Sequence, residues 1–272
     1  MKHVLDGFKD ECLFLEPFPH IIIEDALPEK DINMLLSEIE KADSLIDYDS
    51  SRLQPRYQLS ESDMKENNLD ASAEFCRIHS SNEFIHSVFD IFEPFIKTNL
   101  PNLPDEIKDV ASATTSFIKN VPPISKSYSP RKPHVDNFKD IFAFLFYIKP
   151  KSSCVAGGNL QIYKFKDKFH GFDRSQTTDY HYLPSKDLEL CKEVQYKNNT
   201  LVLFLDGINT IHGVEPLEPG STPRYYFTGG AQFNHPCYDP RSFLSFPDLL
   251  KDIVGEFAQK VRGKYIGRDP YL

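Results

Sequence analysis

Two kinds of hydrophobic pattern divide this chain into regions. After residue 110, short apolar runs rich in β-branched and aromatic residues alternate with turn residues such as Gly157-Gly158 and Asn198-Asn199. Runs of this composition, bounded by turn signals, are typical of β-strands. They predict an all-β core over about 110–234, with strands at 110–118, 141–148, 159–165, 200–205 and 224–233. An earlier strand is predicted within 12–25.

Helical periodicity appears on both sides of this core. Ile32, Leu35, Leu36 and Ile39 recur at helical spacing after Pro28, which predicts a helix there. A second helix is predicted after the capping-box pattern Ser80 to Glu83, and Pro94 should end or kink it. A C-terminal helix is predicted at about 245–263, with Ser245 as its cap and its end near Gly263.

Two polar segments interrupt these patterns. Residues 43–79 read as a long loop with one short helix near 61–68, and residues 166–192 read as a polar insertion in the β core. The whole layout is N-terminal helical support over 1–109, a β core over about 110–234, and a C-terminal helix. No repeat or linker divides the chain, so we expect residues 1–272 to form a single domain.

Composition narrows the classes of function. A formal charge of −9 and a pI near 5.5 argue against nucleic acid or an anionic membrane as the main partner. No apolar run approaches the roughly 18 residues of a membrane span, and charged residues stand where a signal peptide needs an apolar core. Five cysteines with no CxxC pair suggest reduced thiols. We therefore expect a cytoplasmic enzyme or binding protein.

Candidate chemistry gathers at His134-Val-Asp136, which directly precedes the strand predicted at 141–148. Residues i and i+2 of a strand share a face, so both side chains can reach one metal ion, and His212 is the best third ligand. Two His and one carboxylate form the ligand set of non-haem Fe(II) oxygenases. A His-x-Asp pair alone arises about once by chance in such a chain, and each residue in isolation suits a structural role better. Whether these residues form a metal site therefore depends on the surrounding sequence pattern.

That pattern resembles a known family. His134-Val-Asp136-Asn, Phe142-Ala-Phe-Leu-Phe-Tyr147 and Gly157-Gly-Asn-Leu160 resemble the prolyl-hydroxylase-like group of 2-oxoglutarate- and Fe(II)-dependent oxygenases. Leu201-Val-Leu-Phe204, His212-Gly-Val214 and Arg224-Tyr-Tyr-Phe-Thr228 resemble the second half of the same family. The resemblance covers about residues 110–234 and implies a double-stranded β-helix, the jelly-roll core that is also found in cupins.

The resemblance also implies roles for residues. His134, Asp136 and His212 match the Fe(II) ligands, Arg224 matches the residue that holds the distal carboxylate of 2-oxoglutarate, and Tyr147 matches a tyrosine that adds a hydrogen bond to it. The cofactors implied are Fe(II), 2-oxoglutarate and O2, with ascorbate as an additional candidate. The chain departs from the family in a longer spacing between His212 and Arg224, in Tyr226 where many relatives have Ser, and in Asn159 where many have Glu.

The predicted function is hydroxylation of an unactivated C–H bond in an amino-acid-like small molecule or a peptide side chain, with release of succinate and CO2. Asp136 favours hydroxylation, because related halogenases lack this carboxylate. One alternative is a cupin-type metalloenzyme that uses no 2-oxoglutarate, and another is a non-catalytic jelly-roll binding module. The sequence leaves open the substrate, the oligomeric state, the pathway, and whether 43–79 and 166–192 cover the site.

Overall fold

Two antiparallel β-sheets form the centre of the protein. The structure is a computed structural model that describes residues 1–46, 56–104, 112–127, 129–173 and 181–265, with side chains to residue 258. In these ranges a seven-stranded sheet has the order β1-β2-β10-β6-β12-β4-β3, and a five-stranded sheet has the order β8-β5-β11-β7-β9. The predicted mainly β class is confirmed, and the two sheets form the double-stranded β-helix core.

The strands predicted from the sequence lie close to their predicted positions, and the two sheets contain further short strands that were not predicted. Those of the larger sheet are β1 (Leu13–Phe14), β2 (His20–Glu24), β3 (Arg56–Leu59), β4 (Ser112–Asn120), β6 (Asp140–Ile148), β10 (Thr200–Leu205) and β12 (Arg224–Gln232). Those of the smaller sheet are β5 (His134–Val135), β7 (Leu160–Phe165), β8 (His181–Tyr182), β9 (Leu188–Val194) and β11 (Ile211–Val214). The predicted start of the 110–118 strand lies outside the described residues.

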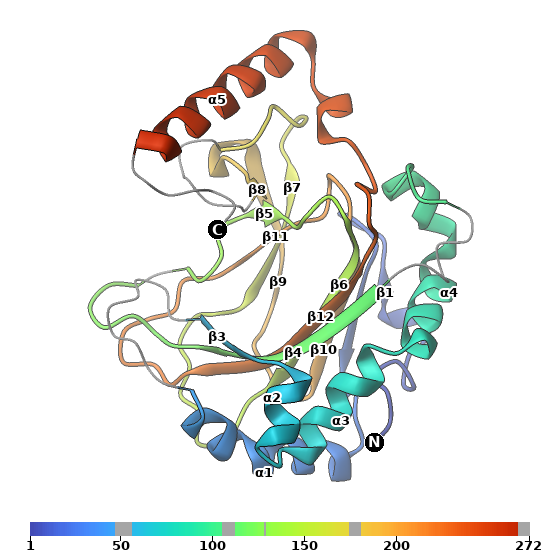
Figure 1. Ribbon diagram of the computed structural model, residues 1–272, viewed down its shortest axis with the longest axis vertical. Coiled ribbons are helices and arrows are strands. Elements are labelled where there is room, and N and C mark those ends of the chain that lie inside the picture. The colour runs from blue at the N-terminus through green and yellow to red at the C-terminus, as the bar shows by residue number, and fades with distance from the viewer. Residues whose placement is uncertain (47–55, 105–111, 128, 174–180, 266–272) are drawn as a thin grey trace.

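Helices cover one face of the larger sheet. They are α1 (Glu29–Ser44), α2 (Glu61–Glu66), α3 (Asp70–His79) and α4 (Asn82–Asn99), and Figure 1 shows them gathered on the side away from β7 and β9. Helix α5 (Phe246–Tyr265) lies apart from them, near β7 and β8 (Figure 1). Short 3-10 turns lie at Asp10–Cys12, Ser185–Asp187 and Pro240–Phe243. None of the helices in the described part of the chain is both long and apolar enough to cross a membrane.

The alternation of side chains along the strands separates two cores. On β6, the rings of Phe142, Phe144 and Phe146 pack into the large core that includes the helices. Tyr147 faces the other way and joins the smaller core between the sheets, together with Tyr226 of β12. Because a strand alternates its faces, the residues that point between the sheets are available to a site there.

The predictions for the two polar segments were wrong. Residues 43–79 are not a long loop in their described part, because they include β3, α2 and α3, and the predicted short helix corresponds to α2. Helix α3 supports the larger sheet, since Phe75 stacks on Phe146 and Phe227 with ring centroids 5.1 and 4.3 Å apart. Residues 166–192 are also not merely an insertion, because β8 and the start of β9 lie within them and pair in the smaller sheet.

Helix α4 begins one residue later than its predicted cap implies and runs through Pro94. Its N-cap is Ser81, whose hydroxyl accepts the Phe84 N–H, so the cap lies one residue after Ser80. Pro94 does not end the helix, which continues to Asn99. Buried side chains on both sides of the proline, Phe92 and Ile96, anchor the helix to the core and outweigh the loss of one backbone hydrogen bond.

Candidate metal centre

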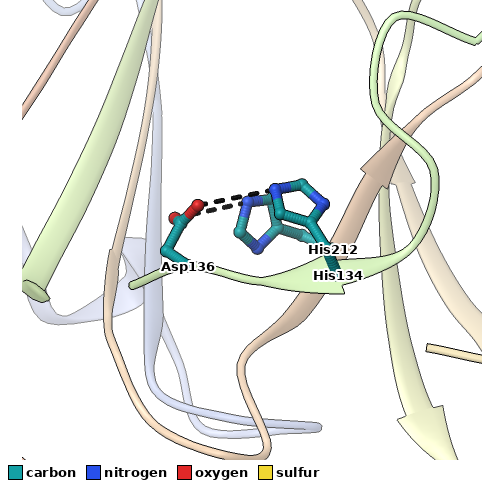
Figure 2. Close-up of side chains that lie close together, drawn as sticks. All are labelled: His134, Asp136 and His212. Carbon is teal, nitrogen blue, oxygen red and sulfur yellow. Dashed lines mark ion pairs between the residues drawn. The ribbon is translucent and has the colours of Figure 1, made fainter. Parts of the chain in front are cut away.

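His134, Asp136 and His212 come together between the two sheets. β5 and β11 are adjacent strands, and His134 and His212 are direct partners in their register. Asp136 follows β5 directly, and its Oδ1 lies 3.4 Å from His134 Nε2 while its Oδ2 lies 3.5 Å from His212 Nε2. Figure 2 shows the carboxylate pointing at both rings. Adjacent ligand atoms about 2.1 Å from a metal ion lie about 3 Å apart, so this spacing fits one ion.

The backbone fixes the orientation of both imidazole rings. His134 Nδ1 lies 2.8 Å from the carbonyl oxygen of Lys132, and His212 Nδ1 lies 3.2 Å from that of Thr210. A carbonyl oxygen only accepts, so each Nδ1 donates, and in the neutral ring the Nε2 lone pair is left for a metal ion. Both lone pairs are on the side of the Asp136 carboxylate.

The charges of the group suit a divalent cation. Burial is the largest effect on His212 and lowers its pKa to about 4, although the nearby Asp136 carboxylate opposes this. Burial alone would raise the pKa of Asp136, but His212, His134 and Arg131 hold it well below its usual range. The site therefore offers a neutral imidazole at His212 and an ionised carboxylate at Asp136 near neutral pH, which are the forms that bind metal ions.

Arg131 contacts the same atoms and was missed by the sequence analysis. Its Nη1 lies 3.1 Å from His134 Nε2 and 3.2 Å from Asp136 Oδ1. The side chain is partly exposed and comes from the segment that precedes β5. Arg131 lies three residues before His134 and outside every predicted strand and helix. The hydrophobic pattern therefore does not indicate where its side chain points. It places a positive charge beside the carboxylate.

A second polar group surrounds Arg224, the first residue of β12. Its guanidinium carbon lies 4.8, 5.2 and 4.7 Å from the ring centroids of Tyr147, Tyr196 and Tyr226. Arg224 is fully buried, and none of its side-chain nitrogens has a hydrogen-bond partner among the described residues. The buried Tyr147 hydroxyl also has none in that part of the chain. Tyr196 and Asn120 are further members of this pocket that the sequence analysis did not single out.

A buried guanidinium without a counter-charge is unfavourable unless a ligand supplies one. A carboxylate supplies it best, because the guanidinium fork gives it two parallel, charge-assisted hydrogen bonds. Burial raises the pKa of Tyr147, so its hydroxyl keeps the proton that it can donate to the same carboxylate. These residues therefore fit one end of a 2-oxo diacid.

Two glycines hold the neighbouring turn close to this pocket. Gly157 and Gly158 both have positive φ angles, +76° and +80°, which favour glycine. A Cβ at Gly158 would lie 2.7 Å from Leu217 Cδ2 and 3.2 Å from Arg224 Cδ. The predicted turn is therefore also a wall of the Arg224 pocket, and the residues between His212 and Arg224 pack against it.

The other residues considered from the sequence lie elsewhere or have local roles. The Asn137 side chain accepts the Lys139 N–H in a turn, and His235 is exposed. His79 is buried under the larger sheet, where it contacts Phe75 and the N-terminus. Tyr226 contacts Arg224, and its hydroxyl accepts a hydrogen bond from the Asn120 amide at 3.3 Å.

Comparison with known proteins agrees with this geometry. Residues 126–229 match the sequence model of the family described as the 2OG-Fe(II) oxygenase superfamily. The matched segment contains His134, Asp136, Tyr147, His212 and Arg224. The matched segment is therefore of the Fe(II)- and 2-oxoglutarate-dependent oxygenase type, and Fe(II), 2-oxoglutarate and O2 are the cofactors that this family implies. The predicted family and cofactor set are confirmed at this level.

Similar solved structures include several prolyl hydroxylases. A prolyl hydroxylase from Trichoplax adhaerens, in complex with a hypoxia inducible factor peptide fragment, is 11% identical with a TM-score of 0.44 and covers 78% of this chain and 83% of its own. A prolyl 4-hydroxylase from Phytophthora capsici is 17% identical (TM-score 0.44, 89% and 68% covered), and one from Pseudomonas putida is 14% identical (TM-score 0.44, 79% and 92% covered). Among curated protein sequences, none matches this chain significantly.

Proposed function

We propose that this enzyme hydroxylates an unactivated C–H bond of an amino-acid-like small molecule or a peptide side chain, with Fe(II) held by His134, Asp136 and His212. The observation that carries the proposal is the pairing of this three-residue group with the buried guanidinium of Arg224, whose nitrogens have no hydrogen-bond partner among the described residues. The first supplies a facial ligand set and the second supplies an anchor for a dicarboxylate co-substrate. We further propose that residues 1–272 act as one domain, in which the N-terminal helices support the larger sheet.

Each side chain has a separate task in this proposal. His134 and His212 present Nε2 lone pairs whose direction the Lys132 and Thr210 carbonyls fix, and Asp136 supplies one negative charge. Ligands on one face leave the other positions open for co-substrate and O2. When bound, Fe(II) and 2-oxoglutarate together activate O2, and the co-substrate leaves as succinate and CO2. Asp136 supports hydroxylation over halogenation, because it fills the position that a halide would need.

Arg224 and the tyrosines around it orient the co-substrate. The guanidinium donates to the distal carboxylate, and the Tyr147 hydroxyl donates to the same group. The rings of Tyr147, Tyr196 and Tyr226 exclude water from the guanidinium, which strengthens its interaction with an anion. A fixed distal carboxylate leaves the 2-oxo acid end free to reach the metal ligands.

The experiment that tests this function is succinate formation with a panel of free amino acids and short peptides. We expect succinate only when both Fe(II) and 2-oxoglutarate are supplied, together with a product one oxygen heavier than its substrate. Mn(II)-loaded protein that fails to bind 2-oxoglutarate by calorimetry would contradict the proposal, whichever substrate is tried.

A further inference from the structure

A cluster of carboxylates lies beside the metal ligands, away from Arg224. Carboxylate oxygens of Asp136, Asp140 and Asp206 all lie within 4.8 Å of one another. Asp140 begins β6 and pairs with Gln232 at the end of β12, whereas Tyr147 pairs with Tyr226 near the opposite end of the same two strands. The metal ligands therefore have a cationic pocket towards one end of these strands and an acidic one towards the other.

Asp206 is the member of this cluster that has an unused hydrogen-bond acceptor among the described residues. It follows β10 and is 2% exposed, and its Oδ2 is buried with no hydrogen-bond partner among the described residues. Asp140 differs, because its Oδ1 accepts from the Gln232 amide at 2.6 Å and its Oδ2 from the Asn137 N–H at 3.1 Å. Asp136 accepts from Arg131. A buried carboxylate oxygen that lacks a donor, next to two other carboxylates, is stabilised either by a proton or by a bound cation.

The surroundings favour an organic cation over a second metal ion. Mg2+ and Ca2+ take about six to eight oxygen ligands, and here two of the three carboxylates already have other partners. Aromatic rings are close by. Phe138 stands between Asp136 and Asp140 in the chain, and the Tyr238 ring packs against it with centroids 5.5 Å apart. Carboxylates combined with aromatic faces recognise ammonium and guanidinium groups.

We propose that Asp206, assisted by Asp140 and Tyr238, forms a subsite that binds a positively charged group of the substrate, either an ammonium or a guanidinium. This inference rests on the proposed function and deepens it by naming the charge of the substrate. Since 2-oxoglutarate is an anion held at Arg224, the acidic cluster repels it and remains for the second reactant. A cation at Asp206 brings the neighbouring carbons of the substrate close to Asp136 and hence to the metal ion.

Binding to the full chain loaded with Mn(II) and 2-oxoglutarate tests this subsite without turnover. Calorimetry compares two matched pairs of probes. Nα-acetyl-lysinamide against Nα-acetyl-norleucinamide tests a side-chain cation, and norleucinamide against Nα-acetyl-norleucinamide tests an α-ammonium. We expect the charged member of one pair to bind at least about tenfold more tightly than its neutral partner. The pair that shows the preference identifies the source of the cation.

The variant Asp206→Asn keeps the shape of the side chain and removes its charge. It should lose at least about tenfold in affinity for the preferred probe while 2-oxoglutarate affinity stays unchanged. Glu189→Gln, which removes an exposed carboxylate of β9, is the control and should change neither. Thermal unfolding checks that the Asp206→Asn variant is folded, and the probe pairs on the unmodified enzyme test the proposal if it is not.

The binding results distinguish failure of the Asp206 subsite from failure of the proposed function. If 2-oxoglutarate binds but neither charged probe exceeds its neutral partner, the carboxylates share protons among themselves and the subsite is overturned, while the proposed function stands. If neither metal nor 2-oxoglutarate binds, both are overturned.

Discussion

His134 and His212 face each other directly across the β5–β11 ladder, with ring centroids 4.4 Å apart. Backbone hydrogen bonds between adjacent strands therefore set the separation of the two imidazoles, and no flexible loop lies between them. Asp136 completes the group from the residues that follow β5, where its position depends on the two rings and on Arg131. The metal site thus combines two residues fixed by the sheet with one held by side-chain contacts.

Removing the Asp136 carboxylate tests the ligand set. Asp136→Ala should weaken Mn(II) binding by at least about 100-fold and abolish hydroxylation, because one ligand and its negative charge beside both imidazoles are lost. Metal affinity is measured by calorimetry and the product by mass spectrometry. Glu189→Ala serves as the control. Unchanged metal affinity in the Asp136→Ala variant would show that another group binds the ion.

Arg131 should oppose metal binding. A positive charge next to Asp136 Oδ1 repels a divalent cation, and because the side chain is partly exposed the effect is moderated by solvent. Arg131→Gln is expected to tighten Mn(II) binding by about three- to tenfold, whereas Arg77→Gln, an exposed arginine of α3, should not alter it. Weaker metal binding after the Arg131 substitution would instead mean that Arg131 orients Asp136.

The parts of the fold that were predictable from sequence have strong local patterns. β6 and β10 are nearly continuous apolar runs because both of their faces are covered, by helices on one side and by the other sheet on the other. Arg224 stood out through the family resemblance, because it follows His212 at the start of a predicted strand. These patterns are local in sequence. His134, Tyr147, His212 and Arg224 could therefore be recognised in their order along the chain without knowledge of the distances between them.

The parts that were missed lack such patterns. Helix α3 is only ten residues long, and apart from Phe75 and Cys76 the residues it buries are small or polar, such as Ala71, Ala73 and His79, so few large apolar side chains mark it in the sequence. β9 is an edge strand that exposes four of its seven residues and carries three charged ones, so it resembled a solvated insertion. Asp206, after an apolar strand and before Gly207, looks like an ordinary turn residue, and only the packing of β6 against β10 brings it near Asp136.

Buried His79 should make the stability of the fold depend on pH. Its ring donates to the Phe75 carbonyl and accepts the Val4 N–H, and burial lowers its pKa to about 3. The unfolded chain binds this proton near pH 6.5, so stability is full above that value and falls as the pH drops towards 3. Between about pH 7.5 and 5.5 this group should cost about 1.4 kcal/mol of unfolding free energy.

Urea denaturation at the two pH values measures that loss. His79→Gln should show a smaller difference between the two pH values than the unmodified protein, whatever its absolute stability. His86→Gln, which replaces an exposed histidine of α4, should behave like the unmodified protein. Equal pH dependence in the His79→Gln variant would place the responsible proton elsewhere.

Arg224 should serve 2-oxoglutarate binding at the expense of stability. A buried guanidinium with no hydrogen-bond partner among the described residues destabilises the fold, and apolar replacements of buried charges often raise stability by about 1–4 kcal/mol. Arg224→Met should therefore unfold at the same temperature or higher, yet bind 2-oxoglutarate at least about thirtyfold more weakly, because the two charge-assisted hydrogen bonds are lost. Arg224→Lys keeps the charge without the planar guanidinium group. Its affinity for 2-oxoglutarate should lie between that of the unmodified protein and that of the Arg224→Met variant. Calorimetry with Mn(II)-loaded protein and thermal denaturation measure both effects. Unchanged 2-oxoglutarate affinity in the Arg224→Met variant would favour a cupin-type enzyme that uses no 2-oxo acid, because the tyrosine-lined pocket would then have no carboxylate to hold.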